Sequence, residues 1–167
     1  ATVVFAAKQP DINTKVTDLL KKMTLEEKVG QMTQISIEIV CKGCPLLKEP
    51  LELDMKKLRK AIVNYHVGSI LNVGTHAHSL DHWHKIIEAI QDVATRQTRL
   101  KIPVIYVIDA IHGAGYVKDA TLFPQNIGMA ATWNPELMKK NGEITAFEVR
   151  TAGIPWNFNP VLGVGRQ

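Results

Sequence analysis

The chain has 167 residues, of which 46% are hydrophobic and 22% charged, with a formal net charge of +4. This composition is typical of a globular protein with one sizeable core, and it argues against disorder. The lysines alternate with acids along helical stretches and lack interleaved aromatic residues, so nucleic acid is not an expected partner. No apolar run reaches the roughly 20 residues that a membrane span needs, so no membrane partner is expected either.

Residues 1–13 are expected to form an extended lead-in to a single domain over residues 14–167. Apolar residues at helical spacing from Thr14 onward predict a first helix. Thr24 and Glu27 then have the spacing of a capping box, in which each side chain satisfies the other residue's backbone amide, so a second short helix is expected to begin there.

Residues 36–52 show no sustained period and are expected to form a loop that holds both cysteines. Cys41 and Cys44 could be a redox pair, half of a zinc site, a small loop disulfide or a structurally incidental pair. No second pair is present, and no strand-to-helix context flanks them, which favours the incidental pair.

Three short apolar runs further along have the character of strands, and amphipathic helices separate them. The strands are expected near residues 68–74, 102–109 and 154–159. The intervening helices are expected over residues 54–66, 79–100 and 134–153. Strands that alternate with long helices are typical of βα units with a parallel sheet, so the fold class is α/β. The run at 102–109 does not alternate, which predicts a strand buried on both faces.

Polar residues that suit ligand binding follow these predicted strands. Asp109 and His112 come directly after the second strand, and Arg166 lies beyond the third. A carboxylate and a guanidinium that converge on one pocket suit a polyhydroxylated ligand, since each can engage two neighbouring hydroxyls. Trp156 could supply a stacking wall, although its place inside the strand favours core packing. The alternative is that Asp109 caps a turn and His112 is a packed histidine.

Four histidines after the first predicted strand suggest a different chemistry. His76 and His78 form a His-x-His, and His82 and His84 follow closely. Such a pair at the end of a barrel strand holds zinc in metal-dependent hydrolases. The spacing argues against it, because Gly74 is expected to end the strand before His76, and His82 and His84 would point apart on a helix.

Seven motifs occur in one order along residues 14–166, and together they resemble the N-terminal domain of family 3 glycoside hydrolases, the group of β-glucosidases and related exo-acting enzymes. These motifs are Met23–Met32, Gly68–Leu71, Arg99–Pro103, Ile108–Gly113, Ala120–Pro124, Glu148–Gly153 and Trp156–Pro160. The resemblance implies the N-terminal part of a (β/α)8 TIM-type barrel. It also implies hydrolysis of terminal β-linked glucosyl residues by a retaining mechanism with two carboxylates, without metal or organic cofactor.

The resemblance assigns Asp109 and Arg166 to the subsite that binds the terminal sugar, and it makes His112 a residue of the same motif that shapes the loop. The family usually has an aspartate where Gly163 stands, and its nucleophile and acid/base lie further on. The chain is therefore expected to be truncated and inactive alone, with a carbohydrate substrate and the remainder of the same enzyme as its partners. A periplasmic or secreted location is expected, because many relatives are exported. A metal-dependent hydrolase and a non-catalytic sugar-binding or assembly module stay open as alternatives.

Overall fold

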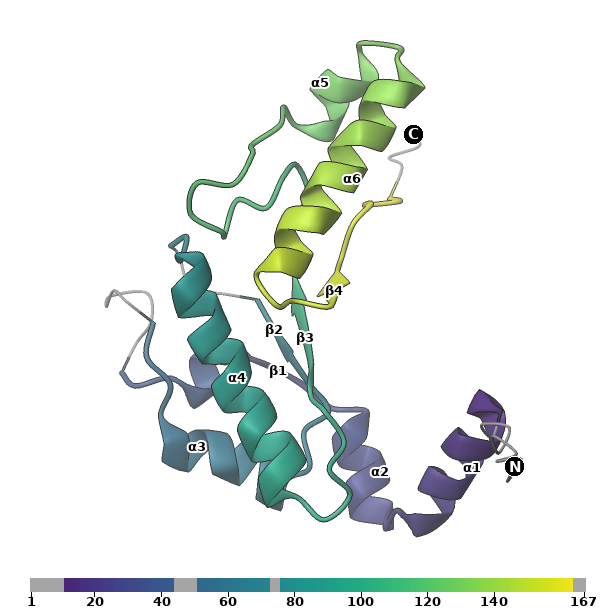
Figure 1. The fold of residues 1–167 in the computed structure, drawn as a ribbon, viewed down its shortest axis with the longest axis vertical. Coiled ribbons are helices and arrows are strands. Elements are labelled where there is room, and N and C mark those ends of the chain that lie inside the picture. Colours follow the sequence, from purple (N-terminus) through teal and green to yellow (C-terminus); the bar gives the residue numbers. More distant parts are fainter. Residues whose placement is uncertain (1–10, 44–50, 73–75, 164–167) are drawn as a thin grey trace, which may run out of the picture.

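Four parallel strands form the sheet in the computed structural model, which describes residues 11–43, 51–72 and 76–163 (Figure 1). The strand order within this described part follows the chain order. The strands are β1 (Gln34–Ser36), β2 (Ser69–Leu71), β3 (Ile105–Ile108) and β4 (Trp156–Asn157). Each of the three predicted strands is present but shorter than expected. The strand β1 was not predicted, because its three residues are too few to show a period.

Helices connect successive strands, as a parallel sheet requires. The N-terminal helices are α1 (Ile12–Lys22) and α2 (Leu25–Gln31), and a 3-10 turn η1 (Ile37–Val40) follows β1. Between β1 and β2 the chain forms α3 (Met55–Arg59), which continues into a π-helical turn η2 (Lys60–Asn64). The helix α4 (Leu80–Gln97) links β2 to β3, and α5 (Asn126–Ala130) and α6 (Pro135–Thr151) link β3 to β4.

Side-chain caps begin the helices where the sequence predicted them. Thr24 and Glu27 form the complete capping box of α2, with each side chain bonded to the other residue's backbone. Ser79 accepts a hydrogen bond from the His82 amide at the start of α4, and Asn134 does the same for α6, in which Pro135 is the first residue. These contacts satisfy backbone amides that have no partner inside the helix.

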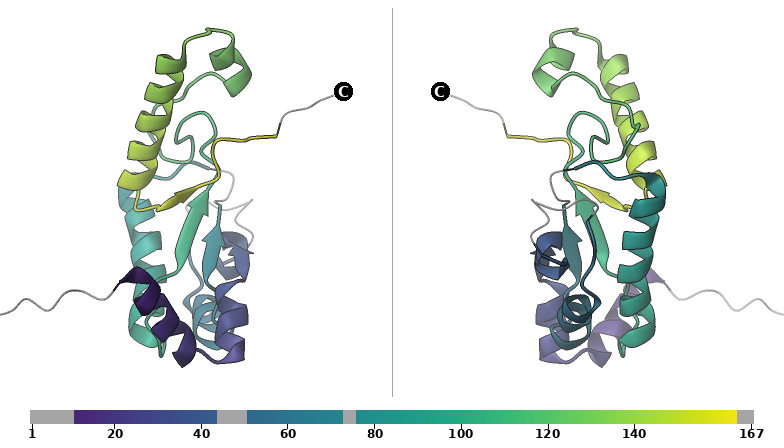
Figure 2. Two further views of the ribbon diagram at one scale, coloured as in Figure 1. Left: turned by 90° about the vertical axis from the view of Figure 1, so that its right-hand side faces the viewer. Right: turned by 90° about the vertical axis from the view of Figure 1, so that its left-hand side faces the viewer.

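The core lies between the sheet and the helices that follow its strands. Ile70 and Tyr106 are opposite each other on β2 and β3 and are fully buried. Trp83 of α4 packs edge-to-face on Tyr106, with ring centroids 5.7 Å apart, and its indole N–H donates to the Tyr116 carbonyl. Figures 1 and 2 show α4 running along the strands, so its apolar stripe faces the core as its periodicity predicted.

The other face of the sheet is partly open at its ends, although Tyr106, Val107 and Ile108 of β3, which alternate between its two faces, are buried as the sequence predicted. Ile105 of β3 is 48% exposed, and Trp156 of β4 is 42% exposed. The rings of Trp156 and Phe158 pack edge-to-face, with centroids 4.9 Å apart. Trp156 is absent from the buried core, so the expectation that it packs there is wrong. In the described part of the chain, helices cover one face of the sheet and leave these side chains on the other.

A close contact between α2 and the start of β2 explains the glycine at position 68. A Cβ atom there would lie 2.3 Å from the Gln31 carbonyl oxygen, so only glycine fits. Gly68 does not take the left-handed conformation of a helix C-cap, which His66 adopts with a φ of 56°. The sequence shows a glycine in the correct place but cannot show that a helix distant in the chain presses on it.

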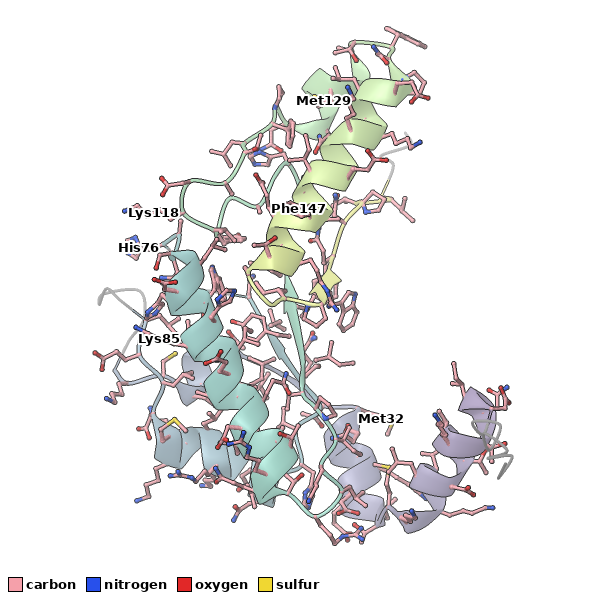
Figure 3. All side chains as sticks on the ribbon, viewed as in Figure 1. Met32, His76, Lys85, Lys118, Met129 and Phe147 are labelled. Atoms are coloured by element: carbon pink, nitrogen blue, oxygen red, sulfur yellow. The ribbon has the colours of Figure 1, made fainter. Side chains whose placement is uncertain are left out.

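The helix α1 stands apart from the sheet (Figure 1), and none of its residues is buried. It begins at Ile12, so the predicted extended lead-in ends before residue 13, and residues 1–10 lie outside the described part. Exposed apolar side chains continue onto α2 and beyond it to Met32, which is 81% exposed (Figure 3). In the described ranges, no helix is long and apolar enough to cross a membrane.

Candidate functional site

Asp109 lies directly after β3, at the carboxyl end of the sheet, and is half-buried. Its Oδ2 accepts a hydrogen bond of 3.1 Å from Nδ2 of Asn72, the residue that follows β2. Because carboxyl ends of parallel strands share one edge, the two side chains meet there although 37 residues separate them. The sequence predicted Asp109 at this edge and missed Asn72.

The backbone of Asn72 is fixed on both sides. Its amide donates to the Val107 carbonyl at 2.8 Å, and its carbonyl accepts from the Tyr106 hydroxyl. Burial raises the pKa of Tyr106 well above its usual value, so the phenol remains protonated and can donate this bond. Asn72 adopts a φ of 68°, a conformation that asparagine tolerates better than most residues. An asparagine just after a short apolar strand was the signal in the sequence.

Asn157 fixes the chain on the other side of Asp109. Its Oδ1 accepts from the Ala110 amide at 2.9 Å, and its Nδ2 donates to the Ala110 carbonyl at 3.1 Å. The Phe158 amide also donates to the Ile108 carbonyl at 3.0 Å. The side chain of Asn157 thus faces a polar group. The group is the backbone of the residue that follows Asp109.

His112 closes the loop that begins after Asp109. Its Nδ1 lies 2.9 Å from the Phe123 carbonyl oxygen, and the Phe123 amide donates to the His112 carbonyl at 2.8 Å. Gly113 has a φ of 107°, and a Cβ atom there would lie 2.1 Å from the Thr121 carbonyl oxygen. These contacts give His112 a position in the loop, whereas its contact with substrate stays a prediction.

Glu148 of α6 holds the far side of the same loop. Its carboxylate accepts from the Thr121 amide at 3.1 Å and from the Thr121 hydroxyl at 2.8 Å. The loop therefore supplies the hydrogen-bond partners of the Glu148 carboxylate. Arg166 lies outside the described residues, so its predicted contact with a sugar also stays a prediction.

The histidines do not assemble a metal site in the described ranges, where no three His, Cys, Asp or Glu residues gather in a way that could hold an ion. His76 is exposed just before α4 (Figure 3), and His78 is buried against His82 and Trp83. The Nε2 atoms of His82 and His84 each lie 2.8 Å from a backbone carbonyl, those of Leu51 and Thr151.

Cys41 is buried at the end of η1, and its Sγ lies 3.1 Å from the Ile37 carbonyl oxygen. Burial, with a contribution from Glu38, raises the pKa of its thiol to about 11. Cys44 lies outside the described residues. The geometry of the Cys41 thiol therefore suits a packed residue and not a reactive thiolate.

Comparison with known proteins decides the family. The model of the glycosyl hydrolase family 3 N terminal domain matches residues 24–167. The chain belongs to this family. As a member of family 3 it contributes the N-terminal strands of a TIM-type barrel, and the predicted resemblance and fold class are confirmed.

Among curated relatives of this family 3 chain, the lysosomal beta glucosidase of Dictyostelium discoideum is 38% identical over 93% of the chain and 19% of the relative. The periplasmic beta-glucosidase of Salmonella typhimurium is 32% identical over 91% of the chain and 17% of the relative. The structure of an exo-1,3/1,4-beta-glucanase from a Pseudoalteromonas species is 33% identical, with a TM-score of 0.72, over 93% of this chain and 18% of that one. The chain thus spans less than a fifth of the length of each of these relatives.

Proposed function

We propose that this chain is the N-terminal part of a longer retaining glycoside hydrolase that removes terminal β-linked glucosyl residues. The proposal is supported by membership of family 3 and by the printed names of the relatives, two of which are beta-glucosidases. The partly open sheet face agrees with it, because the exposed side chains of Ile105 and Trp156 would be covered by further strands of a closed barrel. The rest of the same enzyme is thus the first partner of this chain.

The position of Asp109 is the observation that carries the proposal. It is a half-buried carboxylate at the carboxyl end of a parallel strand, where barrel enzymes place the residues that contact substrate. A carboxylate can accept hydrogen bonds from two neighbouring sugar hydroxyls. In the described part of the chain Asp109 is hydrogen-bonded to Asn72 through Oδ2, so Oδ1 can serve a hydroxyl.

The other parts of the proposed site are assigned as the family resemblance implies. Arg166 contacts the same sugar, and His112 shapes the loop beside it. The nucleophile and the acid/base come from residues beyond the matched motifs, and neither metal nor organic cofactor takes part. The isolated chain of residues 1–167 is accordingly inactive.

Replacement of Asp109 by Asn in the full-length protein tests the site. The neutral amide loses charge-assisted bonds to the sugar, so kcat/KM for an aryl β-glucoside falls about 10- to 150-fold. Asp119→Asn is the matched control, because Asp119 is exposed in the same loop and has a φ of 66° that Asn also tolerates. An unchanged kcat/KM in Asp109→Asn would remove Asp109 from the site.

Two further measurements separate the alternatives. Turnover by a verified 167-residue preparation would contradict the assignment of the catalytic carboxylates to other parts of the enzyme, and glucose binding without turnover by the full-length protein would favour a sugar-binding module. Dialysis against a chelator should leave the activity of the full-length enzyme unchanged. A loss that zinc restores would favour the metal-dependent alternative with His76 and His78.

We also propose a periplasmic or secreted location. The names of the relatives support it, since one is lysosomal and another periplasmic, and both compartments lie outside the cytosol. Fractionation of the native host, with the protein followed by antibody, tests this location. Recovery of the protein only with cytosolic markers would contradict it.

A further inference from the structure

Asn72 is the one described side chain hydrogen-bonded to Asp109, and several restraints fix its place. Its backbone amide and carbonyl are both bonded to β3, to Val107 and Tyr106. Its φ of 68° turns the chain just beyond β2 and directs the amide toward the carboxylate. The side chain therefore has little freedom to choose another partner.

The orientation of the Asn72 amide follows from the charge that it faces. A carboxylate accepts hydrogen bonds and cannot donate one, so Nδ2 must face Asp109 and Oδ1 must face away. In that direction Oδ1 is buried and has no hydrogen-bond partner among the residues that the structure describes. A buried carbonyl without a partner destabilises a protein, and such a group calls for an explanation in function or strain. The hydrogen bond from Nδ2 to Asp109 offsets the cost of leaving Oδ1 without a partner in this arrangement.

We infer that Asn72 is a positioning residue that holds the Asp109 carboxylate in its sugar-binding orientation. This inference rests on the proposed function of Asp109. By donating to Oδ2, Asn72 fixes the rotamer of Asp109 before substrate arrives and leaves Oδ1 directed to the ligand. A fixed carboxylate gives up less conformational freedom on binding, so the gain is in substrate affinity.

The residue type at position 72 is narrowly determined by these demands. Glycine would accept the left-handed backbone but has no donor, and serine and larger residues adopt that backbone less readily. Aspartate would suit the backbone but would place a second carboxylate against Asp109, which is repulsive. Asparagine meets both requirements.

The test is a double-mutant cycle in the full-length protein with an aryl β-glucoside as substrate. Asn72→Gly keeps the backbone and removes the donor, so kcat/KM falls about 3- to 10-fold, mainly through KM. Asn72→Asp introduces repulsion and should lower kcat/KM further. In the Asp109→Asn background both losses should largely disappear. For Asn72→Gly, position 109 then has no charged group left to orient. For Asn72→Asp, the amide at position 109 is not repelled and can donate a hydrogen bond to the new carboxylate.

The outcomes separate the two claims. If Asp109→Asn alone leaves kcat/KM unchanged, the proposed function of Asp109 fails, and the inference about Asn72 fails with it. If Asp109→Asn lowers kcat/KM but the Asn72 variants have no effect, or the same effect in both backgrounds, Asp109 keeps its role and Asn72 is only structural. Asn72→Asp also serves if Asn72→Gly does not fold, since aspartate tolerates the same φ.

Discussion

The side chain of Asn157 makes both of its hydrogen bonds to the backbone of Ala110, the residue next to Asp109. Ala110 is buried, so its backbone amide and carbonyl need hydrogen-bond partners. The side chain of Asn157 in β4 supplies them in place of a backbone group of the sheet. Together with Asn72 on the β2 side, Asn157 fixes the segment that carries Asp109 from both neighbouring strands. The position of this carboxylate therefore depends on three strands.

Asn157→Ala should lower both stability and substrate affinity. It leaves the amide and the carbonyl of Ala110 buried without partners, which costs about 1–3 kcal/mol in the free energy of unfolding. Urea denaturation of the full-length protein measures that loss, and KM for an aryl β-glucoside should rise. Asn157→Asp should not restore stability or KM, because one carboxylate oxygen would face the Ala110 carbonyl. Full recovery with aspartate would contradict the role of the donated bond.

Local patterns in the sequence were sufficient for the helix starts and for Asp109. The capping box at Thr24 and Glu27 and the cap at Asn134 involve residues three positions apart, so their chemistry is visible without the fold. Asp109 was found because an apolar strand ends in front of it. In each case the partner is close in the chain or is the strand itself.

The missed features depend on contacts between distant residues. The strand β1 has only three residues, too few to show a period, and it is recognisable only by its pairing with β2. Asn72 and Gly68 have their roles because Asp109 and Gln31 lie against them, and neither partner can be located from local periodicity. Trp156 was expected in the core because strand position alone does not say which face of a sheet is covered.

Gly68→Ala and Gly142→Ala should change stability in opposite directions. The first places a methyl group against the backbone of Gln31, which cannot move without displacing α2, and should cost about 1–3 kcal/mol. The second lies within α6 with nothing within 4 Å of an added Cβ atom, and should stabilise by about 0.5–1 kcal/mol. Thermal unfolding of both variants tests this, and an equal Tm for the two would contradict the packing at Gly68.

The ion pair between Glu27 and Arg99 should make stability depend on pH at the acidic end. Arg99 donates to both carboxylate oxygens of Glu27, at 3.1 and 2.5 Å, and this contact, followed by the Thr24 amide, lowers the pKa of Glu27 below 4.5. A lowered folded-state pKa stabilises above the unfolded value and loses that contribution as pH falls through the folded value.

Glu27→Gln should therefore have a lower urea midpoint than the unmodified protein at pH 7, and the difference should shrink toward about pH 3. The matched control is Glu52→Gln, whose partner Lys42 is exposed, as is Glu52 itself, and this variant should change the midpoint little at either pH. If the difference caused by Glu27→Gln is the same at both pH values, the ion pair does not contribute through ionisation.

Cys41 should be slow to react with thiol reagents while the protein is folded. Its pKa is raised from 9.0 to about 11, so at pH 8 the thiolate population is about 100-fold lower than for an ordinary thiol. In a Cys44→Ser variant, alkylation by iodoacetamide should be at least that much slower in buffer than in urea.

The same pKa shift predicts that stability falls as pH rises above about 9, because the unfolded thiol ionises before the folded one. The double variant Cys41→Ser/Cys44→Ser should lose this dependence of stability on pH. For the alkylation experiment, rapid reaction of the folded protein would contradict the packed thiol and restore the redox-pair hypothesis.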